Sequence, residues 1–237
     1  MLWFTSDTHF GHANALHFTD RPWDDVERMG RDMVANINAR VAPDDDLYIL
    51  GDYSFKMTAE AAAALRATIN CRKVHLIPGN HDKDWTQRAV ADTFIVEPPI
   101  VKLNIHGQKL ILSHFPLMDW PSMSHGSWHL HGHIHSCGAV YNELNRRQGL
   151  MRYDVGVDAN NYLPVSLDEI RSWFADVEYC GRARWWDWVN GTCDPEVALA
   201  CEQVREVMRE PQGGYQTAQE SAEAARTRSA KLRGLEV

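Results

Sequence analysis

Short apolar runs alternate with amphipathic segments along the first 80 residues. The runs at residues 2–6, 47–50 and 73–77 predict three buried strands. Residues 24–41 place apolar side chains three or four positions apart, which predicts a helix with one buried face. Residues 58–69 predict a second helix, with Thr58 as its N-cap and Glu60 in its first turn. The chain therefore begins as strand, helix, strand, helix, strand.

From residue 94 the pattern changes to consecutive strands. Residues 94–114 predict strands joined by a hairpin around His106 and Gly107, and residues 127–131 and 152–159 predict two more. A βαβαβ start followed by neighbouring strands is typical of a layered α/β protein, not of a purely parallel sheet. We therefore predict one α/β domain over residues 1–175.

Residues 176–237 differ from the rest of the chain. They contain Trp185, Trp186 and Trp188, an amphipathic stretch at 195–210 and a polar tail. We predict a C-terminal helical, tryptophan-rich extension whose indole rings pack against the main domain, because large aromatic side chains are usually buried. The alternative is that these rings line a substrate-binding wall.

The composition narrows the class of protein. Apolar residues make up 44% and charged residues 24% of the 237 residues, and no apolar run approaches the roughly 20 residues that cross a bilayer. The five cysteines form no CxxC pair, which disfavours a disulfide framework or a structural zinc site. The net charge of −8 argues against coating of nucleic acid but allows a small anionic substrate held by metal ions. We expect a cytoplasmic protein without a membrane segment.

Metal-binding side chains follow the predicted strands. These side chains are Asp7, His9, Asp52, Asn80, His81, His114, His133 and His135. Because loops at the carboxyl ends of strands converge at one edge of an α/β sheet, we expect these residues to meet there. Imidazole, carboxylate and amide ligands suit manganese, iron, zinc, cobalt or nickel.

Each of these clusters alone has an ordinary structural explanation. A Gly-Asp pair after a strand is commonly a turn, and a lone His114 is more often a hydrogen-bonded core histidine than a ligand. Five such clusters, each placed after an apolar strand, favour a shared metal site over five independent coincidences.

The same motifs resemble those of the calcineurin-like metallophosphoesterase superfamily. They are Asp7-x-His9, Gly51-Asp52, Gly79-Asn80-His81-Asp82, His114 and Gly132-His133-x-His135. The resemblance implies a four-layer αββα sandwich of two mixed β-sheets flanked by helices, holding two metal ions. It assigns Asp7, His9 and His135 to one ion, Asn80, His114 and His133 to the other, and Asp52 as the bridge. It also implies that His81 contacts the substrate phosphate or the leaving group without binding metal.

Within residues 129–135, the resemblance separates four alternating histidines. It implies that His133 and His135 bind different ions, and we attribute this to a sharp chain turn at Gly132. His129 and His131 precede the turn and match no ligand position. We predict that both are strand residues, with His131 in a position to orient a ligand.

Departures from the superfamily pattern narrow the subgroup. Residues 51–55 lack the second aspartate and the Arg-Gly pair of protein serine/threonine phosphatases, and the segments around His12 and Arg21 resemble a compact bacterial and phage branch. Arg21 is a candidate to grip a phosphate bidentately, with a surface arginine at a helix end as the alternative. His12 is a candidate phosphate donor, with an ordinary residue at a helix N-terminus as the alternative.

Two divalent ions about 3.5–4 Å apart clamp a phosphoryl group and activate a bridging water as hydroxide. We therefore predict hydrolysis by a metal-bridging hydroxide, with Asp52 and His81 as the catalytic residues and manganese as the favoured metal. The motif loops contain few cations, namely Arg21, Lys56 and Lys83. This favours a phosphodiester, which is nucleotide-like or a nucleic acid. The alternatives are a phosphomonoesterase and a non-catalytic scaffold with the same fold.

Overall fold

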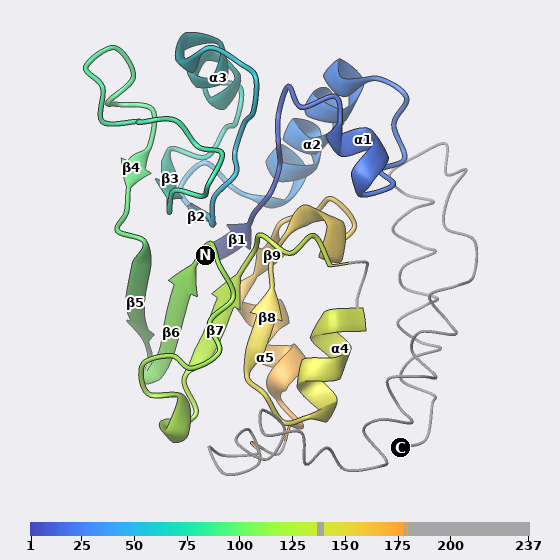
Figure 1. Ribbon diagram of the computed structural model, residues 1–237. Coiled ribbons are helices and arrows are strands. Elements are labelled where there is room, and N and C mark those ends of the chain that lie inside the picture. The colour runs from blue at the N-terminus through green and yellow to red at the C-terminus, as the bar shows by residue number, and fades with distance from the viewer. Residues whose placement is uncertain (137–139, 178, 180–237) are drawn as a thin grey trace.

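The computed structural model describes residues 1–136, 140–177 and 179. Nine strands form two sheets (Figure 1). The first sheet has the order β4 (Ile95–Val96), β3 (Lys73–Leu76), β2 (Asp46–Ile49), β1 (Leu2–Thr5) and β9 (Val165–Ser166). The second has the order β5 (Ile100–Ile105), β6 (Gln108–Ser113), β7 (Trp128–His131) and β8 (Arg152–Asp154).

Both sheets are mixed. In the first sheet β1, β2, β3 and β4 are parallel, and only β9 runs antiparallel to its neighbour β1. In the second sheet β6, β7 and β8 are parallel, while β5 and β6 form an antiparallel hairpin. The hairpin turns at His106 and Gly107, which both have positive φ, as predicted from the sequence.

The two helices predicted from the sequence are present. Helix α2 (Val26–Arg40) is capped by Asp25, whose carboxylate accepts hydrogen bonds from the backbone N–H groups of Glu27 and Arg28. Helix α3 (Ala59–Arg66) is capped by Thr58, as predicted. The apolar stripe of α2, which includes Met29, Met33 and Ile37, is buried against the first sheet.

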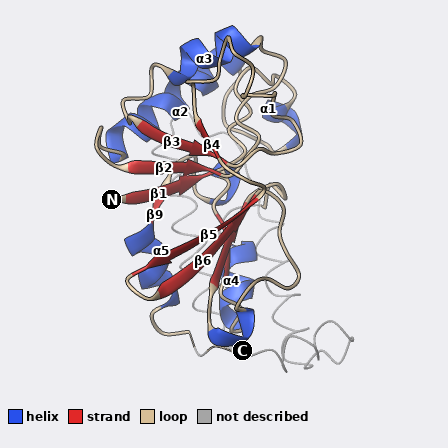
Figure 2. Ribbon diagram, turned by 90° about the vertical axis from the view of Figure 1, so that its left-hand side faces the viewer, coloured by secondary structure: helices blue, strands red, loops and turns tan. Residues whose placement is uncertain are grey.

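Figure 2 shows the layers: α2 and α3, then the two sheets, then the helices at the opposite end. Strand β1 illustrates how the sheets pack, because Phe4 joins the core between the sheets while Trp3 joins the core under α2 and α3. Leu110, Leu112 and Leu130 of the second sheet meet Phe4 in the inter-sheet core. The four-layer α/β sandwich of two mixed sheets is confirmed.

Three helices of the main domain were not predicted from the sequence. Helix α1 (Ala15–Phe18) is a single turn, α4 (Val140–Arg147) packs against β8, and α5 (Leu167–Phe174) closes the side of the inter-sheet core. The apolar pattern missed α4 because its buried positions are polar. Asn142 donates to the backbone carbonyl of Asp154 at 3.0 Å and accepts from the Asp154 N–H at 2.7 Å.

The strand predicted over residues 152–159 is shorter than expected. It ends at Asp154, and residues 157–159 form a 3₁₀ turn instead. The turn follows Gly156, whose N–H donates to the Asp154 carboxylate at 2.8 Å.

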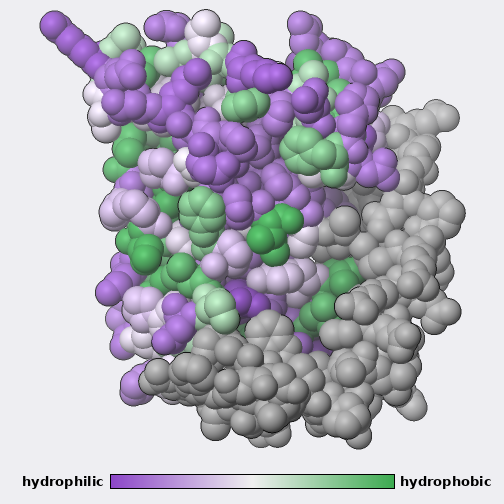
Figure 3. Space-filling model, viewed as in Figure 1, coloured by the Kyte–Doolittle hydropathy of each residue, from purple (hydrophilic) through white to green (hydrophobic). Residues whose placement is uncertain are grey.

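No helix in the described ranges is long and apolar enough to span a membrane. Hydrophilic residues dominate the upper half of the face in Figure 3, over α2 and α3. The predicted C-terminal extension, with Trp185, Trp186, Trp188 and the stretch at 195–210, lies outside the described residues except for its first few positions.

Candidate metal centre

The predicted site residues lie in loops that follow strands of both sheets and meet at one end of the sandwich (Figure 2). Backbone hydrogen bonds tie these loops together. The N–H of Asp7 donates to the carbonyl of Gly51 at 3.0 Å, and the N–H of His9 donates to the carbonyl of Asp52 at 3.0 Å. The N–H of Gly132 donates to the carbonyl of His114 at 3.0 Å. The positions of the side chains are therefore fixed by main-chain contacts.

Five of the seven predicted ligands have positive φ. They are Asp7 (58°), His9 (48°), Asp52 (52°), His133 (73°) and His135 (45°). The left-handed region costs a residue with a Cβ on the order of 1–3 kcal/mol, and such strain gathers at functional sites. The fold holds these side chains in backbone conformations that local sequence preference does not favour.

Gly132 has a different role from the one predicted. The left-handed residue after β7 is His133, and Gly132 is absent from the positive-φ residues. A Cβ at Gly132 would lie 2.0 Å from Ser6 Oγ and 2.3 Å from Asp7 Oδ2. The glycine is therefore required for the close approach of the two sheets at the site, while the turn itself is made at His133.

The structure brings the predicted ligands into two groups, each with donor atoms that lie within 4.8 Å of one another. The first group is Asp7, His9 and His135, and the second is Asp52, His114 and His133. Each group takes side chains from both sheets, because the loops after β1 and β2 belong to the first sheet and those after β6 and β7 to the second.

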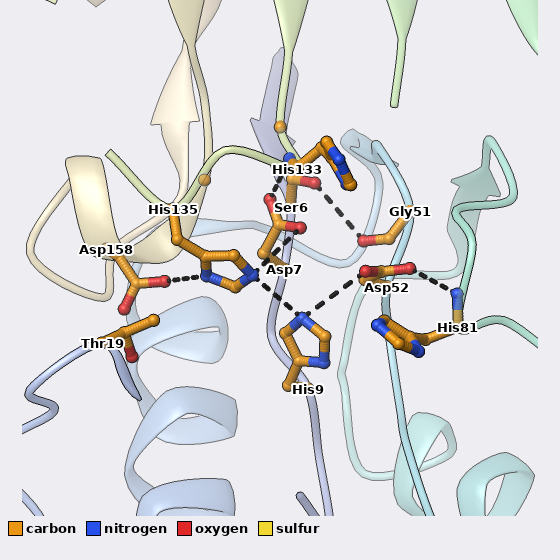
Figure 4. Close-up of polar contacts among 12 residues, drawn as sticks. Ser6, Asp7, His9, Thr19, Gly51, Asp52, His81, His133, His135 and Asp158 are labelled. Carbon is orange, nitrogen blue, oxygen red and sulfur yellow. Dashed lines mark hydrogen bonds and ion pairs between the residues drawn. The ribbon is translucent and has the colours of Figure 1, made fainter. Parts of the chain in front are cut away.

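Asp52 lies between the two groups (Figure 4). Its Oδ2 is 3.5 Å from His9 Nε2 and 3.6 Å from His114 Nε2. Asn80 joins the second group through its Oδ1, which lies 3.0 Å from His114 Nε2. Asp52 therefore lies close to an imidazole of each group, and Asn80 lies beside the second group.

The electrostatics of the first group fit a bound cation. Asp7 is completely buried, and no described residue donates a hydrogen bond to its Oδ1. Burial raises the pKa of Asp7 to about 8, and burial together with neighbouring cationic groups lowers the pKa of His9 to about 2. The His133 N–H donates to the other oxygen, Oδ2, at 2.8 Å, so Oδ1 is the oxygen left to bind an ion. A buried carboxyl oxygen that accepts no hydrogen bond and a neutral imidazole beside it are suited to hold a divalent ion.

Contacts at the Nδ1 atom orient two of the imidazoles. His114 Nδ1 lies 2.8 Å from the carbonyl of Leu50, which turns Nε2 toward Asp52. His135 Nδ1 lies 2.7 Å from the carboxylate of Asp158, which turns its Nε2 toward His9 (Figure 4). A carboxylate behind a ligating histidine fixes its tautomer and increases its basicity.

Arg21 holds Asp158 in place. Its Nε and Nη2 each donate to Asp158 at 2.9 Å, and its Nη groups also donate to the carbonyls of Thr8 and Asp7 at 3.0 and 2.7 Å. Although burial raises the pKa of Asp158, the Arg21 charge and the hydrogen bonds from His135 and Arg21 hold it well below its usual range.

Both sequence readings of Arg21 are corrected by this geometry. The side chain is 0% exposed, so it is not a surface arginine, and its guanidinium is occupied by protein oxygens instead of facing a phosphate. Its role is to position Asp158 and the loop after β1. No role was predicted for Asp158 from the sequence, because it falls within the strand predicted over residues 152–159 and outside every motif that suggested a metal.

Asp82 organises the loop after β3. Its carboxylate accepts from the N–H groups of Gly79 and Asp52 at 2.8 and 2.7 Å and of Tyr53 at 3.0 Å. The sequence motif contained Asp82, but no role was predicted for it. The His81 N–H in turn donates to Asp52 Oδ1 at 2.9 Å, and its side chain is exposed above the centre.

The three other histidines considered in the sequence analysis, His12, His129 and His131, lie in two places. His12 is buried beside the first group, with Nδ1 3.4 Å from His9 Nδ1 and its ring 6.4 Å from that of His81. His129 and His131 lie in β7, fully buried and outside both ligand groups. His131 Nδ1 lies 2.9 Å from the Gly132 carbonyl, at the start of the ligand loop.

Comparisons with known proteins agree with this geometry. A family model described as calcineurin-like phosphoesterase matches residues 1–187. An uncharacterized protein of Methanocaldococcus jannaschii is 33% identical over 171 residues, covering 71% of this chain and 88% of the relative. The gene 66 protein of Mycobacterium phage L5 is 31% identical over 195 residues, covering 71% of this chain and 91% of the relative.

A solved structure shares the fold. The protein of unknown function AQ665 from Aquifex aeolicus superimposes with a TM-score of 0.58 at 22% identity, covering 73% of this chain and 98% of that one. At this level of identity the likeness concerns the fold alone.

Proposed function

The chain belongs to the calcineurin-like phosphoesterase family, whose members hydrolyse phosphate esters with metal ions, and we propose that it is a manganese-dependent phosphodiesterase acting on a nucleotide-like substrate. The observation that carries the proposal is the position of Asp52. Its Oδ2 lies 3.5 Å from His9 Nε2 of the first group and 3.6 Å from His114 Nε2 of the second. One carboxylate oxygen at this distance from both groups is suited to two ions that share a ligand.

Seven side chains would hold the two ions. Asp7, His9 and His135 would bind one, Asn80, His114 and His133 the other, and Asp52 both. Two bound divalent ions would supply an activated water and neutralise charge on the phosphoryl oxygens. The protein contributes fixed positions for these ligands, because hydrogen bonds to Leu50 and Asp158 orient two of the imidazoles.

His81 is suited to act on the substrate. Its backbone is anchored to Asp52 Oδ1, its side chain is exposed, and its ring lies 5.5 Å from that of His9. From this place the imidazole contacts a phosphate oxygen or protonates the departing alkoxide. His12, which lies behind His81 and beside His9, is proposed to donate a hydrogen bond to the phosphate.

The shortage of free cations favours a diester. Arg21 is occupied by Asp158 and two carbonyl oxygens. Lys56 and Lys83 therefore remain as the basic residues of the motif loops. A phosphodiester carries one negative charge and a phosphomonoester close to two, so a diester requires fewer cationic groups around it.

A phosphatase panel tests the proposal. Metal-free protein is reconstituted with Mn²⁺, Zn²⁺, Co²⁺, Ni²⁺ or Mg²⁺ and assayed with bis-p-nitrophenyl phosphate and p-nitrophenyl phosphate. We expect about two ions per chain, highest activity with Mn²⁺, and a higher kcat/KM for the diester. Asp52→Asn is expected to abolish turnover, while His106→Asn at the exposed hairpin serves as the control. Activity on the monoester alone would favour the phosphomonoesterase, and two bound ions without any turnover would favour the scaffold.

A further inference from the structure

The phenylalanines that are not fully buried lie around the candidate metal centre. All seven phenylalanines of the chain lie in its described part, and Phe4, Phe10, Phe94 and Phe174 are buried. The other three are the partly buried Phe55 and the exposed Phe18 and Phe115. Each of these three rings contacts a histidine of the centre. Exposure of phenylalanine is therefore confined to the rim of the site.

Phe18 borders the first ligand group. Its ring centroid lies 5.4 Å from that of His135 and 6.3 Å from that of His9, and the residue is 54% exposed. It ends the one-turn helix α1 and belongs to none of the core clusters. The ring therefore contributes little to packing and leaves a large apolar face open beside the site.

Phe115 borders the second ligand group. Its ring centroid lies 4.5 Å from that of His133 and 4.9 Å from that of His114, and the residue is 47% exposed. Ser113 Oγ donates to its carbonyl at 2.7 Å, which fixes the backbone there. A phosphate held between the two groups would thus have an exposed aromatic ring on each side.

We propose that Phe18 and Phe115 each offer a stacking face to a nucleobase, so that the base of a small nucleoside phosphate held at the centre binds on one of these two rings, and that they thereby determine the specificity of the site. A nucleobase is flat, and stacking on an aromatic side chain strengthens binding because every base has a π-face. The net charge of −8 and the occupied Arg21 favour a small nucleotide over a nucleic-acid strand, which needs many free cations. This inference rests on the proposed function, since the phosphate must be held by the metal centre.

Calorimetry on the full-length, Mn²⁺-loaded protein tests the inference with two probes, adenosine 5′-monophosphate and ribose 5-phosphate. The two differ only by the base. We expect the wild type to bind the adenosine compound about tenfold more tightly. In Phe18→Leu/Phe115→Leu, which keeps apolar side chains but removes both rings, the ratio should fall to about twofold or less, with ribose 5-phosphate affected by less than about twofold.

The control is Met118→Leu, at a residue of the loop after β6 that is 59% exposed. This variant should keep the wild-type ratio of the two affinities. The metal content of every variant should equal that of the wild type. The single variants Phe18→Leu and Phe115→Leu cover the case in which the double variant fails to fold, and one of the two should lower the ratio by itself.

Three outcomes would overturn the inference. The first is equal affinity of the wild type for both probes, and the second is an unchanged ratio in the double variant. The third is binding of a 12-nucleotide single strand more than about tenfold tighter than the mononucleotide, which would indicate a strand-binding surface. Failure of the proposed function is distinguished by bis-p-nitrophenyl phosphate, because then this diester is not hydrolysed and ribose 5-phosphate does not bind.

Discussion

His81 and His135 lie in the same centre but have different surroundings. His135 is anchored to Asp158 and faces the first ligand group, whereas the His81 side chain is exposed. We predict that His135→Ala loses metal and activity together. His81→Ala should keep both ions and slow turnover by roughly 10²–10⁴-fold, as for loss of a proton-transfer group. Elemental analysis beside kcat separates the two, and the opposite pattern of metal loss would show that the roles are wrongly assigned.

Asp158 supports the first ion through His135. Because a carboxylate behind a histidine ligand raises its basicity, we predict that Asp158→Asn weakens binding of one ion by roughly 10–100-fold and leaves the other unchanged. Titration against a chromophoric chelator measures both affinities, and Asp158→Glu should restore part of the loss. Asp84→Asn, at an exposed aspartate bonded to Thr86, is the control. Equal weakening of both ions would indicate a general disturbance of the fold instead.

Single residues also show where sequence reasoning succeeds and fails. The ligands were predictable because each lies in a short motif directly after an apolar strand. Arg21 was not, because its partner Asp158 is 137 positions away and an arginine in a polar segment looks like any surface arginine. Burial of a charge with a distant partner leaves no periodic signal along the chain.

At the level of elements, strand β7 carries a histidine that must stay neutral. His129 Nε2 accepts from the Leu117 N–H at 2.9 Å, and its Nδ1 lies 3.1 Å from the Ile111 carbonyl. The side chain therefore links β7 to β6 and to the loop after β6. Burial lowers the pKa of His129 to about 3. In the unfolded chain the pKa of this histidine is near 6.5, so between pH 3 and 6.5 the unfolded chain binds more protons than the folded one. The contribution of His129 to stability is therefore fully present above about pH 6.5 and is lost as the pH falls toward 3.

His129→Gln tests this strand contribution. The amide preserves one donor and one acceptor but does not titrate, so we predict a smaller loss of unfolding free energy between pH 7.5 and pH 5 than in the wild type. The difference should not exceed about 1.4 kcal/mol per pH unit, the limit for one proton. Urea denaturation of the metal-free protein provides the measurement, and His106→Asn should behave as the wild type. Identical pH dependence in His129→Gln would contradict the assignment.

Elements with an apolar stripe were predictable, and those with a polar buried face were not. Helix α2 showed its period because Met29, Met33 and Ile37 face the sheet. Helix α4 instead buries Asn142 and Asn145, whose side chains bond to the backbone of Asp154 and the guanidinium of Arg152. Hydrogen bonding replaces apolar contact there, and hydropathy does not detect it.

For the molecule as a whole, metal binding and stability should be linked. The centre buries the carboxyl groups of Asp7 and Asp52 among imidazoles, and a bound cation would compensate negative charge there in the folded chain only. We predict that Mn²⁺ at 100 times its Kd adds about 2.7 kcal/mol per site and that a chelator removes it. Thermal unfolding with and without chelator measures the effect. Asp52→Asn should reduce the metal-induced rise in Tm, and an equal rise in that variant would count against a shared ligand.

The layered architecture was predictable from the order of strands and helices, but the pairing of distant strands was not. Strand β9 closes the first sheet against β1, with Phe4 opposite Val165, and it is only two residues long. Such a short strand is defined by its neighbour and by the start of α5, not by its own sequence. The distribution of strands between two sheets likewise depends on contacts across the whole chain.

Because each ligand group takes side chains from both sheets, no segment of the chain carries a complete binding site. Asp7 and His9 emerge from the ribosome early, yet their partner His135 follows only after seven of the nine described strands have been synthesised, and Asp158 after the eighth. Closing such distant contacts is slow, since the entropy of a long loop must be lost before the contact forms. A nascent chain would therefore pass more than half of its synthesis with an incomplete ligand set for each ion, and high-affinity metal uptake would mark the end of folding.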